Sequence, residues 1–136
     1  MSRRELREQI FKFIFRIEFN EKDEMSEQEQ FFFSYFEEEG APIADKDMQY
    51  ISTKGNRIIE KLEEIDDMIN KRAKGWTTQR MGKVDLTILR LAVYEIVFDE
   101  DVPTGVAINE AVELAKKFGQ EESSGFVNGV LAKFAG

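Results

Sequence analysis

Hydrophobic residues recur along almost the whole chain at intervals of three and four positions, and only two prolines interrupt them, Pro42 and Pro103. Residues spaced in this way share one face of an α-helix, whereas a half-buried strand alternates with a period of two. No stretch of strand-like alternation competes with the helical period. The pattern therefore predicts an all-α protein.

Three helices are predicted in the N-terminal half. The first runs from an N-cap at Ser2 to residue 19, and the second begins at Ser26, with Glu29 completing a capping box. Apolar positions over residues 46–74 then predict one long amphipathic helix, although Gly55 inside it disfavours helix formation.

The C-terminal half predicts a connector followed by three further helices. Residues 76–82 form the connector, with one helical turn, and residues 84–99 are apolar nearly all round, which is typical of a central helix. The next helix covers residues 104–118, and the last is capped by Ser123 or Ser124.

Composition excludes most catalytic chemistry. The 136 residues suit one domain, and they include no Cys and no His. Disulfides, zinc ribbons, thiolate nucleophiles and Ser-His-Asp triads are therefore excluded, and we expect no enzyme activity, no metal and no cofactor. The charged N-terminus is unlike a signal peptide, and no apolar run approaches the ~20 residues of a membrane span. We expect a cytoplasmic protein.

Charge is unevenly distributed along a chain whose net charge is −8. Residues 1–17 carry a net charge of +3, residues 18–47 carry −9 and residues 71–90 carry +5. Such asymmetry suits a protein that touches RNA with one face and a basic protein with another. A set of solvated helix faces explains the same charges.

Three motifs follow one another in the C-terminal half: MGKVDLTILRLAVYEI over residues 81–96, VAINEAVELAKKFG over residues 106–119 and FVNGVL over residues 126–131. They closely resemble the NusB family of transcription antitermination factors, and SRR with RE at residues 2–8 resembles the family's N-terminal arginine motif. The resemblance implies a NusB-like fold of about seven helices in two helical subdomains, about residues 1–75 and 76–136, around a shared core.

The resemblance also implies a function. Members of the family bind the boxA element of nascent single-stranded RNA together with the ribosomal protein NusE, and so help RNA polymerase to resist termination, notably on ribosomal RNA operons. We expect these two partners, an indirect link to RNA polymerase and other Nus factors, and no membrane.

Two groups of cations are candidates for RNA contact. Arg3, Arg4 and Arg7 occupy the first turns of the first helix and offer planar donors to phosphates and base edges, unless they are only a solvated terminus. Lys116 and Lys117 end a helix, where positive charge also complements the helix dipole.

The loop before the last helix carries the other RNA candidates. By resemblance, Glu122, Ser123 and Phe126 contact RNA, with Phe126 either stacking on a base or belonging to the core. The chain departs from the family pattern at Gly125, where a basic residue is common, and at Phe15, where many members have Tyr.

For NusE, the family's docking surface corresponds to Gln79, Arg80 and Asp85, near the start of the central helix. Asn109 and Asn128 are interpreted differently, as buried amides that hold helix junctions.

Other functions compete with this interpretation. One is an RNA-modifying enzyme, because the same helical fold resembles the N-terminal domain of some RNA cytosine methyltransferases. Those enzymes need a Rossmann-like domain, which these residues do not provide. The remaining alternative is an acidic helical protein-interaction module or homodimer with little intrinsic RNA affinity. Metal catalysis by carboxylates alone is disfavoured because no paired spacing directs two of them inward.

Overall fold

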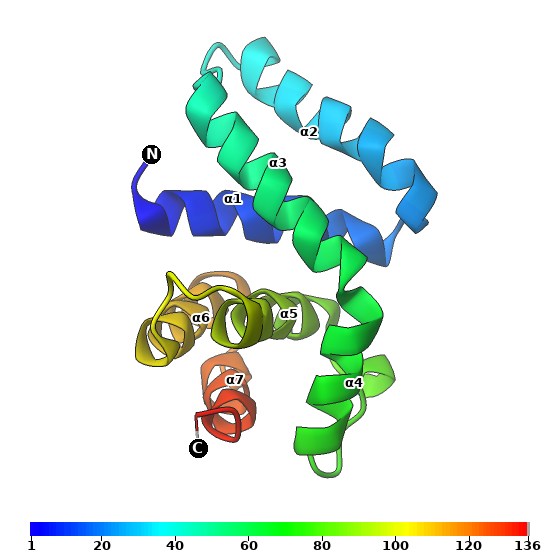
Figure 1. The fold of residues 1–136 in the computed structure, drawn as a ribbon, viewed down its shortest axis with the longest axis vertical. Coiled ribbons are helices and arrows are strands. Elements are labelled where there is room, and N and C mark those ends of the chain that lie inside the picture. Colours follow the sequence, from blue (N-terminus) through cyan, green and yellow to red (C-terminus); the bar gives the residue numbers. More distant parts are fainter. Residues whose placement is uncertain (136) are drawn as a thin grey trace. The chain divides into compact units, whose positions relative to one another are not determined.

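The computed structural model describes residues 1–135, and these residues form helices and turns with no strand. The elements in chain order are α1 (Arg3–Phe15), η1 (Arg16–Glu18), η2 (Lys22–Glu24), α2 (Met25–Glu38), α3 (Asp45–Glu60), α4 (Leu62–Arg72), η3 (Thr78–Arg80), α5 (Lys83–Phe98), α6 (Thr104–Phe118) and α7 (Ser123–Ala132) (Figure 1). The predicted all-α class is confirmed.

The chain divides into two compact units, Met1–Glu60 and Lys61–Gly136. The subdomain boundary near residue 75 that the family resemblance implies stays a prediction. Each unit is described by itself below.

In the first unit, α1 and α3 pack closely around Phe13. A Cβ atom built on Gly55 would lie 2.5 Å from Cδ2 of Phe13, so no larger residue fits at this point without displacing the ring. Phe32 of α2 also packs on Phe13, and the centroids of the two rings lie 5.7 Å apart. The glycine that disfavoured a helix in the sequence is therefore what lets the two helices approach.

The start of α1 confirms the predicted N-cap. The backbone N–H of Glu5 donates to Oγ of Ser2 at 3.1 Å, and the backbone N–H of Ser2 donates to the Glu5 carboxylate at 3.0 Å. The hydrogen bond from the Ser2 backbone N–H, and after it an interaction with the Ser2 side chain, hold the pKa of the Glu5 carboxyl below its ordinary value. The helix ends earlier than predicted, at Phe15, and continues as the 3₁₀ turn η1 rather than as α-helix to residue 19.

The predicted cap of α2 is wrong. The helix begins at Met25, one residue before Ser26, because the preceding turn η2 has its own capping box. Glu29 serves the tertiary structure instead of the cap. Its carboxylate accepts hydrogen bonds from Oγ of Ser52 at 2.9 Å and Nδ2 of Asn56 at 2.8 Å, both on α3.

The single long helix predicted over residues 46–74 is also wrong. Lys61 leaves the helical conformation, with φ −97° and ψ 12°, and separates α3 from α4. Contacts within the second unit account for the break: the Lys61 ammonium lies 4.5 Å from the centroid of the Phe98 ring, and Arg90 of α5 makes two hydrogen bonds of 2.8 Å to the Asp66 carboxylate. These contacts attach α4 to α5 and override the continuous apolar stripe.

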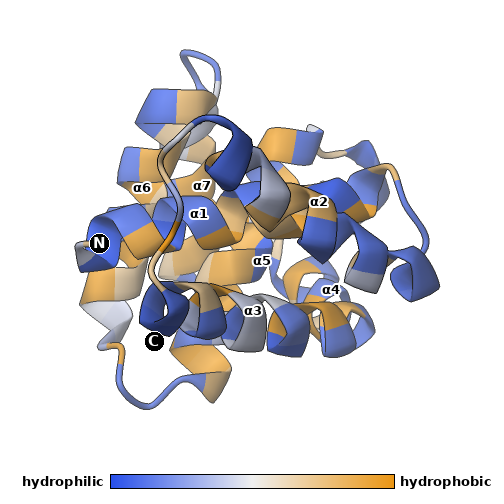
Figure 2. Ribbon diagram, turned by 90° about the horizontal axis from the view of Figure 1, so that it is seen from above, coloured by the Kyte–Doolittle hydropathy of each residue, from blue (hydrophilic) through white to orange (hydrophobic). Residues whose placement is uncertain are grey.

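In the second unit, α5 is the central helix, as predicted. Every residue from Leu86 to Glu95 is buried, and α4, α6 and α7 pack on it. Its ribbon is coloured largely as hydrophobic in Figure 2, unlike the two-sided colouring of α3.

Two further observations bear on earlier expectations. Asn109 and Asn128 are exposed, so their interpretation as buried amides at helix junctions is wrong. Among residues 1–135, no helix is long and apolar enough to cross a membrane, and no group of three or more His, Cys, Asp or Glu side chains is placed to hold a metal ion.

Candidate functional site

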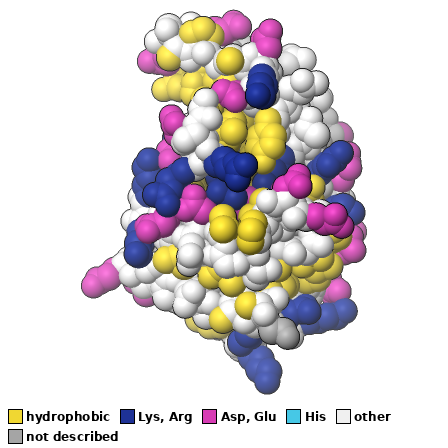
Figure 3. All heavy atoms as spheres, turned by 60° about the vertical axis from the view of Figure 1, so that its left-hand side comes forward, with side chains coloured by type: hydrophobic (Ala, Val, Ile, Leu, Met, Phe, Trp, Pro, Cys, Tyr) yellow, Lys and Arg dark blue, Asp and Glu magenta, His cyan; other side chains and the backbone are white. Residues whose placement is uncertain are grey.

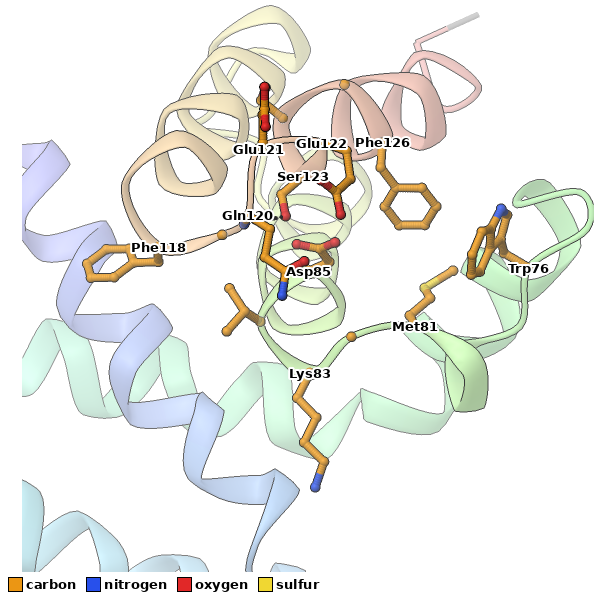
Figure 4. A pocket seen from close by; sticks show the side chains of 15 residues that line it. Trp76, Met81, Lys83, Asp85, Phe118, Gln120, Glu121, Glu122, Ser123 and Phe126 are labelled. Carbon is orange, nitrogen blue, oxygen red and sulfur yellow. Dashed lines mark hydrogen bonds between the residues drawn. The ribbon is translucent and has the colours of Figure 1, made fainter.

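A hollow of about 940 Å³ lies in the second unit, where two segments far apart in the sequence meet. We call it the α5–α7 hollow (Figure 4). Its walls are the connector with the start of α5, the end of α6, and the loop that opens α7. The lining residues are Trp76, Met81, Gly82, Lys83, Val84, Asp85, Phe118, Gly119, Gln120, Glu121, Glu122, Ser123, Ser124, Gly125 and Phe126.

The loop between α6 and α7 is held tightly by Ser123. Its Oγ accepts a hydrogen bond from the backbone N–H of Gln120 at 2.9 Å, and its own N–H donates to the Gln120 carbonyl at 3.0 Å. A Cβ atom on Gly119 would lie 2.5 Å from Cβ of Ser123 and 2.7 Å from the Ala115 carbonyl oxygen. Glycine is therefore required where the chain turns back toward α7. Ser123 is the first residue of α7 rather than its cap.

Two aromatic rings lie at one side of the hollow. Trp76 and Phe126 meet edge to face, with ring centroids 5.5 Å apart and planes at 70°. The Arg80 guanidinium lies 5.7 Å from the Trp76 ring centroid. The backbone N–H of Thr78 donates to Oδ1 of Asn70 on α4 at 2.8 Å, which fixes the connector that carries Trp76 and Arg80.

The three loop residues assigned to RNA by resemblance all line this hollow, and Asp85, assigned to the protein partner, lines it with them. The carboxyl groups of Asp85 and Glu122 lie toward its middle in Figure 4, whereas Lys83 extends away. Ser123 is only 3% exposed, so its role is to shape the loop. Phe126 is half-buried.

The two lysines at the end of α6 do not line the hollow. Both are exposed, and each has a local partner. Nζ of Lys116 lies 4.0 Å from the Glu113 carboxylate, and the Lys117 ammonium lies 5.4 Å from the Phe118 ring centroid. Both lie in the last turn of α6, where their positive charge complements the negative end of the helix dipole, as the sequence predicted.

The three arginines belong to the first unit, at the start of α1. Arg3 and Arg4 are exposed, whereas Arg7 is 9% exposed. The capping box of Ser2 and Glu5 fixes the turn that carries them, so their backbone is ordered even though the side chains of Arg3 and Arg4 reach solvent.

The positions assigned to the protein partner lie on neighbouring elements. Gln79 and Arg80 are exposed in η3, and Asp85 lies in the first turn of α5, where a carboxylate complements the positive end of the helix dipole. Of these three, only Asp85 reaches the hollow.

Sequence reasoning missed Trp76, which it treated only as part of a connector. The side chain is 47% exposed although it is the single tryptophan of the chain. Exposure of the largest aromatic side chain at the edge of a hollow is a signal for recognition, because tryptophan is otherwise mostly buried. On the face drawn in Figure 3, hydrophobic side chains lie among interspersed Lys, Arg, Asp and Glu side chains.

Comparison with known proteins identifies the family. The family model described as NusB family matches residues 4–136. The chain belongs to the NusB family. The resemblance inferred from the three motifs is thereby confirmed, and the NusB family is one of transcription antitermination proteins, not of enzymes.

Individual NusB proteins are similar over nearly the whole length. The transcription antitermination protein NusB of Agathobacter rectalis is 53% identical over 135 residues, which cover 99% of this chain and 100% of that protein. A solved structure of T. maritima NusB has a TM-score of 0.83 at 37% identity, covering 99% of this chain and 91% of that one. A chain in a crystal structure of the antitermination factors NusB and NusE in complex with dsRNA has a TM-score of 0.79 at 28% identity, covering 97% and 94%. The expected NusB-like fold is confirmed.

Proposed function

We propose that this chain is a transcription antitermination factor that binds boxA-type single-stranded RNA together with the ribosomal protein NusE. In this role it helps RNA polymerase, with other Nus factors, to resist termination, notably on ribosomal RNA operons. The observation that carries the proposal is the likeness, over nearly the full chain, to a NusB solved together with NusE and RNA. Nascent RNA is its ligand, so the site of action is the cytoplasm.

RNA contact on α1 is assigned to the arginines of its first turns. The exposed guanidinium groups of Arg3 and Arg4 can donate in pairs to phosphates or base edges. Arg7, which is largely buried, supports this turn and offers less of its guanidinium to RNA.

RNA contact in the second unit is assigned to the end of α6 and the loop that follows. Lys116 and Lys117 supply positive charge, and Phe126 supplies a ring face at the hollow. Ser123 acts by holding the loop in shape. Glu122, as a carboxylate, can accept hydrogen bonds from the amino groups of bases.

NusE is assigned to the surface formed by Gln79, Arg80 and Asp85. Residues 71–90 as a whole carry +5, so within this surface the carboxylate of Asp85 is the group that a basic protein can pair with. Because Asp85 lines the same hollow as the RNA-binding loop, we propose that the protein partner and the RNA bind side by side at its edge.

The test is a titration of a labelled boxA-like single strand, with and without NusE, at several salt concentrations. Releasing counterions from single strands gives a log-log slope of about 0.7 per neutralised phosphate. Joint replacement of Arg3, Arg4 and Arg7 by Ala should therefore flatten the slope by about 1.4 through the two exposed arginines, and by roughly 2 only if Arg7 also reaches a phosphate. The matched control removes three exposed lysines outside the site, Lys22, Lys46 and Lys133. It should leave the slope within about 0.5 of the parent value, since these lysines contact no phosphate.

Two outcomes would contradict the proposal. An unchanged slope in the triple-arginine variant removes α1 from the RNA site. Absence of RNA binding even with NusE, together with a dimer in light scattering, favours the alternative of an acidic interaction module.

A further inference from the structure

We propose that the α5–α7 hollow receives one nucleobase of the bound RNA, stacked on the indole ring of Trp76 beside Phe126. The inference rests on the proposed function and assigns to RNA a residue that neither the sequence motifs nor the assignments above include. Trp76 would thus be a specific base-stacking residue at the junction of the connector and α7.

The first reason is the exposure and support of the indole. Trp76 is 47% exposed and contacts Phe126 edge to face, so the pair leaves ring surface open toward the hollow. The hydrogen bond between the Thr78 N–H and Asn70 fixes the connector, so the ring needs little further ordering when it binds a ligand. Binding costs less affinity when the contacting side chain is already held in place.

The second reason is that the position beside Trp76 already contains a cation. The Arg80 guanidinium lies 5.7 Å from the indole centroid. An Arg or Lys side chain of a protein partner placed on the indole itself would be repelled by Arg80, which leaves Asp85 as the group that such a partner can pair with. A flat neutral base can stack on the indole, and Arg80 can then contact the phosphate that follows it.

The third reason is the polarity of the hollow beyond the rings. Gln120 and Glu122 point toward its middle, and the Gln120 backbone is fixed by Ser123 (Figure 4). A base stacked on Trp76 would have hydrogen-bonding groups at its edge. The volume of about 940 Å³ is sufficient for a base with its sugar.

Because Trp76 is the only tryptophan, the intrinsic fluorescence of the unmodified protein reports on this ring alone. A base stacked on an indole quenches its emission. A boxA-like single strand should therefore quench Trp76 emission along the same saturation curve that polarisation of the labelled RNA gives. An arginine-rich peptide without aromatic residues, the probe for a cationic occupant, should cause no such quenching.

Variants then measure how much the stack contributes. Trp76→Ala should weaken RNA binding by about five- to 150-fold, the range expected for one base–aromatic stack. Trp76→Phe keeps a ring and should lose no more than about threefold, since part of the stack survives. Tyr35→Ala is the matched control, because Tyr35 is a similarly exposed aromatic residue, at 56%, on α2. It should leave the affinity unchanged.

Each result decides whether a nucleobase stacks on Trp76 in the α5–α7 hollow. Binding of RNA without quenching, or with less than twofold loss in Trp76→Ala, overturns the inference and leaves the proposed function intact. Quenching by the arginine-rich peptide overturns it in favour of a protein side chain in the hollow. Absence of RNA binding with and without NusE contradicts the proposed function itself. Thermal melting of Trp76→Ala shows whether its fold is kept, and the quenching of the parent protein decides the matter without any variant.

Discussion

Replacing Gly55 by Ala tests the close contact of α1 and α3 because it sets two opposite effects against each other. In the interior of a helix, Ala is favoured over Gly by about 1 kcal/mol. The added methyl group would, however, lie 2.5 Å and 2.8 Å from Cδ2 and Cε2 of Phe13. Phe13 has no exposed surface and is packed against Phe32, so its ring cannot swing into solvent.

Overpacking a closed core costs about 1–3 kcal/mol, which exceeds the gain in helix propensity over most of that range. We expect Gly55→Ala to lower the free energy of unfolding by about 1 kcal/mol net, measured by urea denaturation. Gly129→Ala is the control, because a Cβ atom there meets no atom within 4 Å. It should raise stability by about 0.5–1 kcal/mol, since only the propensity term remains.

A double variant isolates the contact. In Gly55→Ala/Phe13→Leu, the smaller side chain relieves the clash, so the loss should be smaller than the sum of the single losses by about 0.5–3 kcal/mol. If Gly55→Ala is as stabilising as Gly129→Ala, or if the two single effects are additive, the steric argument is refuted.

Four further changes test the capping box and the site. Ser2→Ala should cost about 1 kcal/mol of stability at α1 and raise the pKa of Glu5 toward its ordinary value in a carboxyl NMR titration. Because folding lowers this pKa, the stabilisation that the ionised Glu5 carboxylate contributes is present at neutral pH and is lost as the pH falls through the carboxyl range. An unchanged pKa would show that the Ser2 side chain plays no part. Asp85→Lys should weaken NusE docking with an unchanged circular dichroism spectrum, whereas an unfolded variant would make Asp85 structural. Phe126→Ala should cost about 1–3 kcal/mol of RNA affinity, and a stability loss of about 3–5 kcal/mol would instead make it a core residue. Gly119→Ala should destabilise the protein by about 1–3 kcal/mol and weaken RNA binding, because the methyl group displaces Ser123; an unchanged melting temperature would contradict this.

Local signals were sufficient to predict the helices whose ends carry their own stop residues. The helix over residues 104–118 was predicted with the bounds that the structure has, since Pro103 precedes it and Gly119 follows it. Its neighbour α5 was predicted within one residue, because its all-round apolar sequence suits only a central position.

The errors arose where tertiary contacts decide. The apolar stripe over residues 46–74 is continuous, so no local sequence signal predicts that the helix breaks at Lys61. The contacts of Lys61 and Asp66 with α5 impose this break. Similarly, Glu29 matches a capping box in sequence but bonds to α3 in the fold. Sequence rules consider only neighbours along the chain, whereas Lys61, Asp66 and Glu29 make their contacts with residues distant in the sequence.

The site shows the same division. Family motifs indicated Glu122, Ser123 and Phe126, but no sequence spacing brings Trp76 to within ring contact of Phe126, fifty positions further along the chain. That contact requires the connector to be fixed to α4 by Asn70 and the α6–α7 loop to be closed by Ser123. Site residues carried by one continuous motif can be predicted, but the hollow they line exists only after the connector with the start of α5 has packed against the α6–α7 loop.

Net charge makes the protein partner part of the RNA-binding mechanism. A chain of net charge −8 repels RNA at long range, so the cations of α1 and the end of α6 act only once the strand is close. Stacking and hydrogen bonding at the hollow are short-ranged and cannot replace the missing attraction. A basic partner bound near Asp85 adds positive charge that offsets this long-range repulsion, so we expect NusE to raise RNA affinity chiefly by accelerating association. The effect should shrink as salt rises, because screening removes attraction and repulsion alike. Stopped-flow association rates at two salt concentrations measure it, and a NusE effect confined to the dissociation rate would refute this electrostatic account.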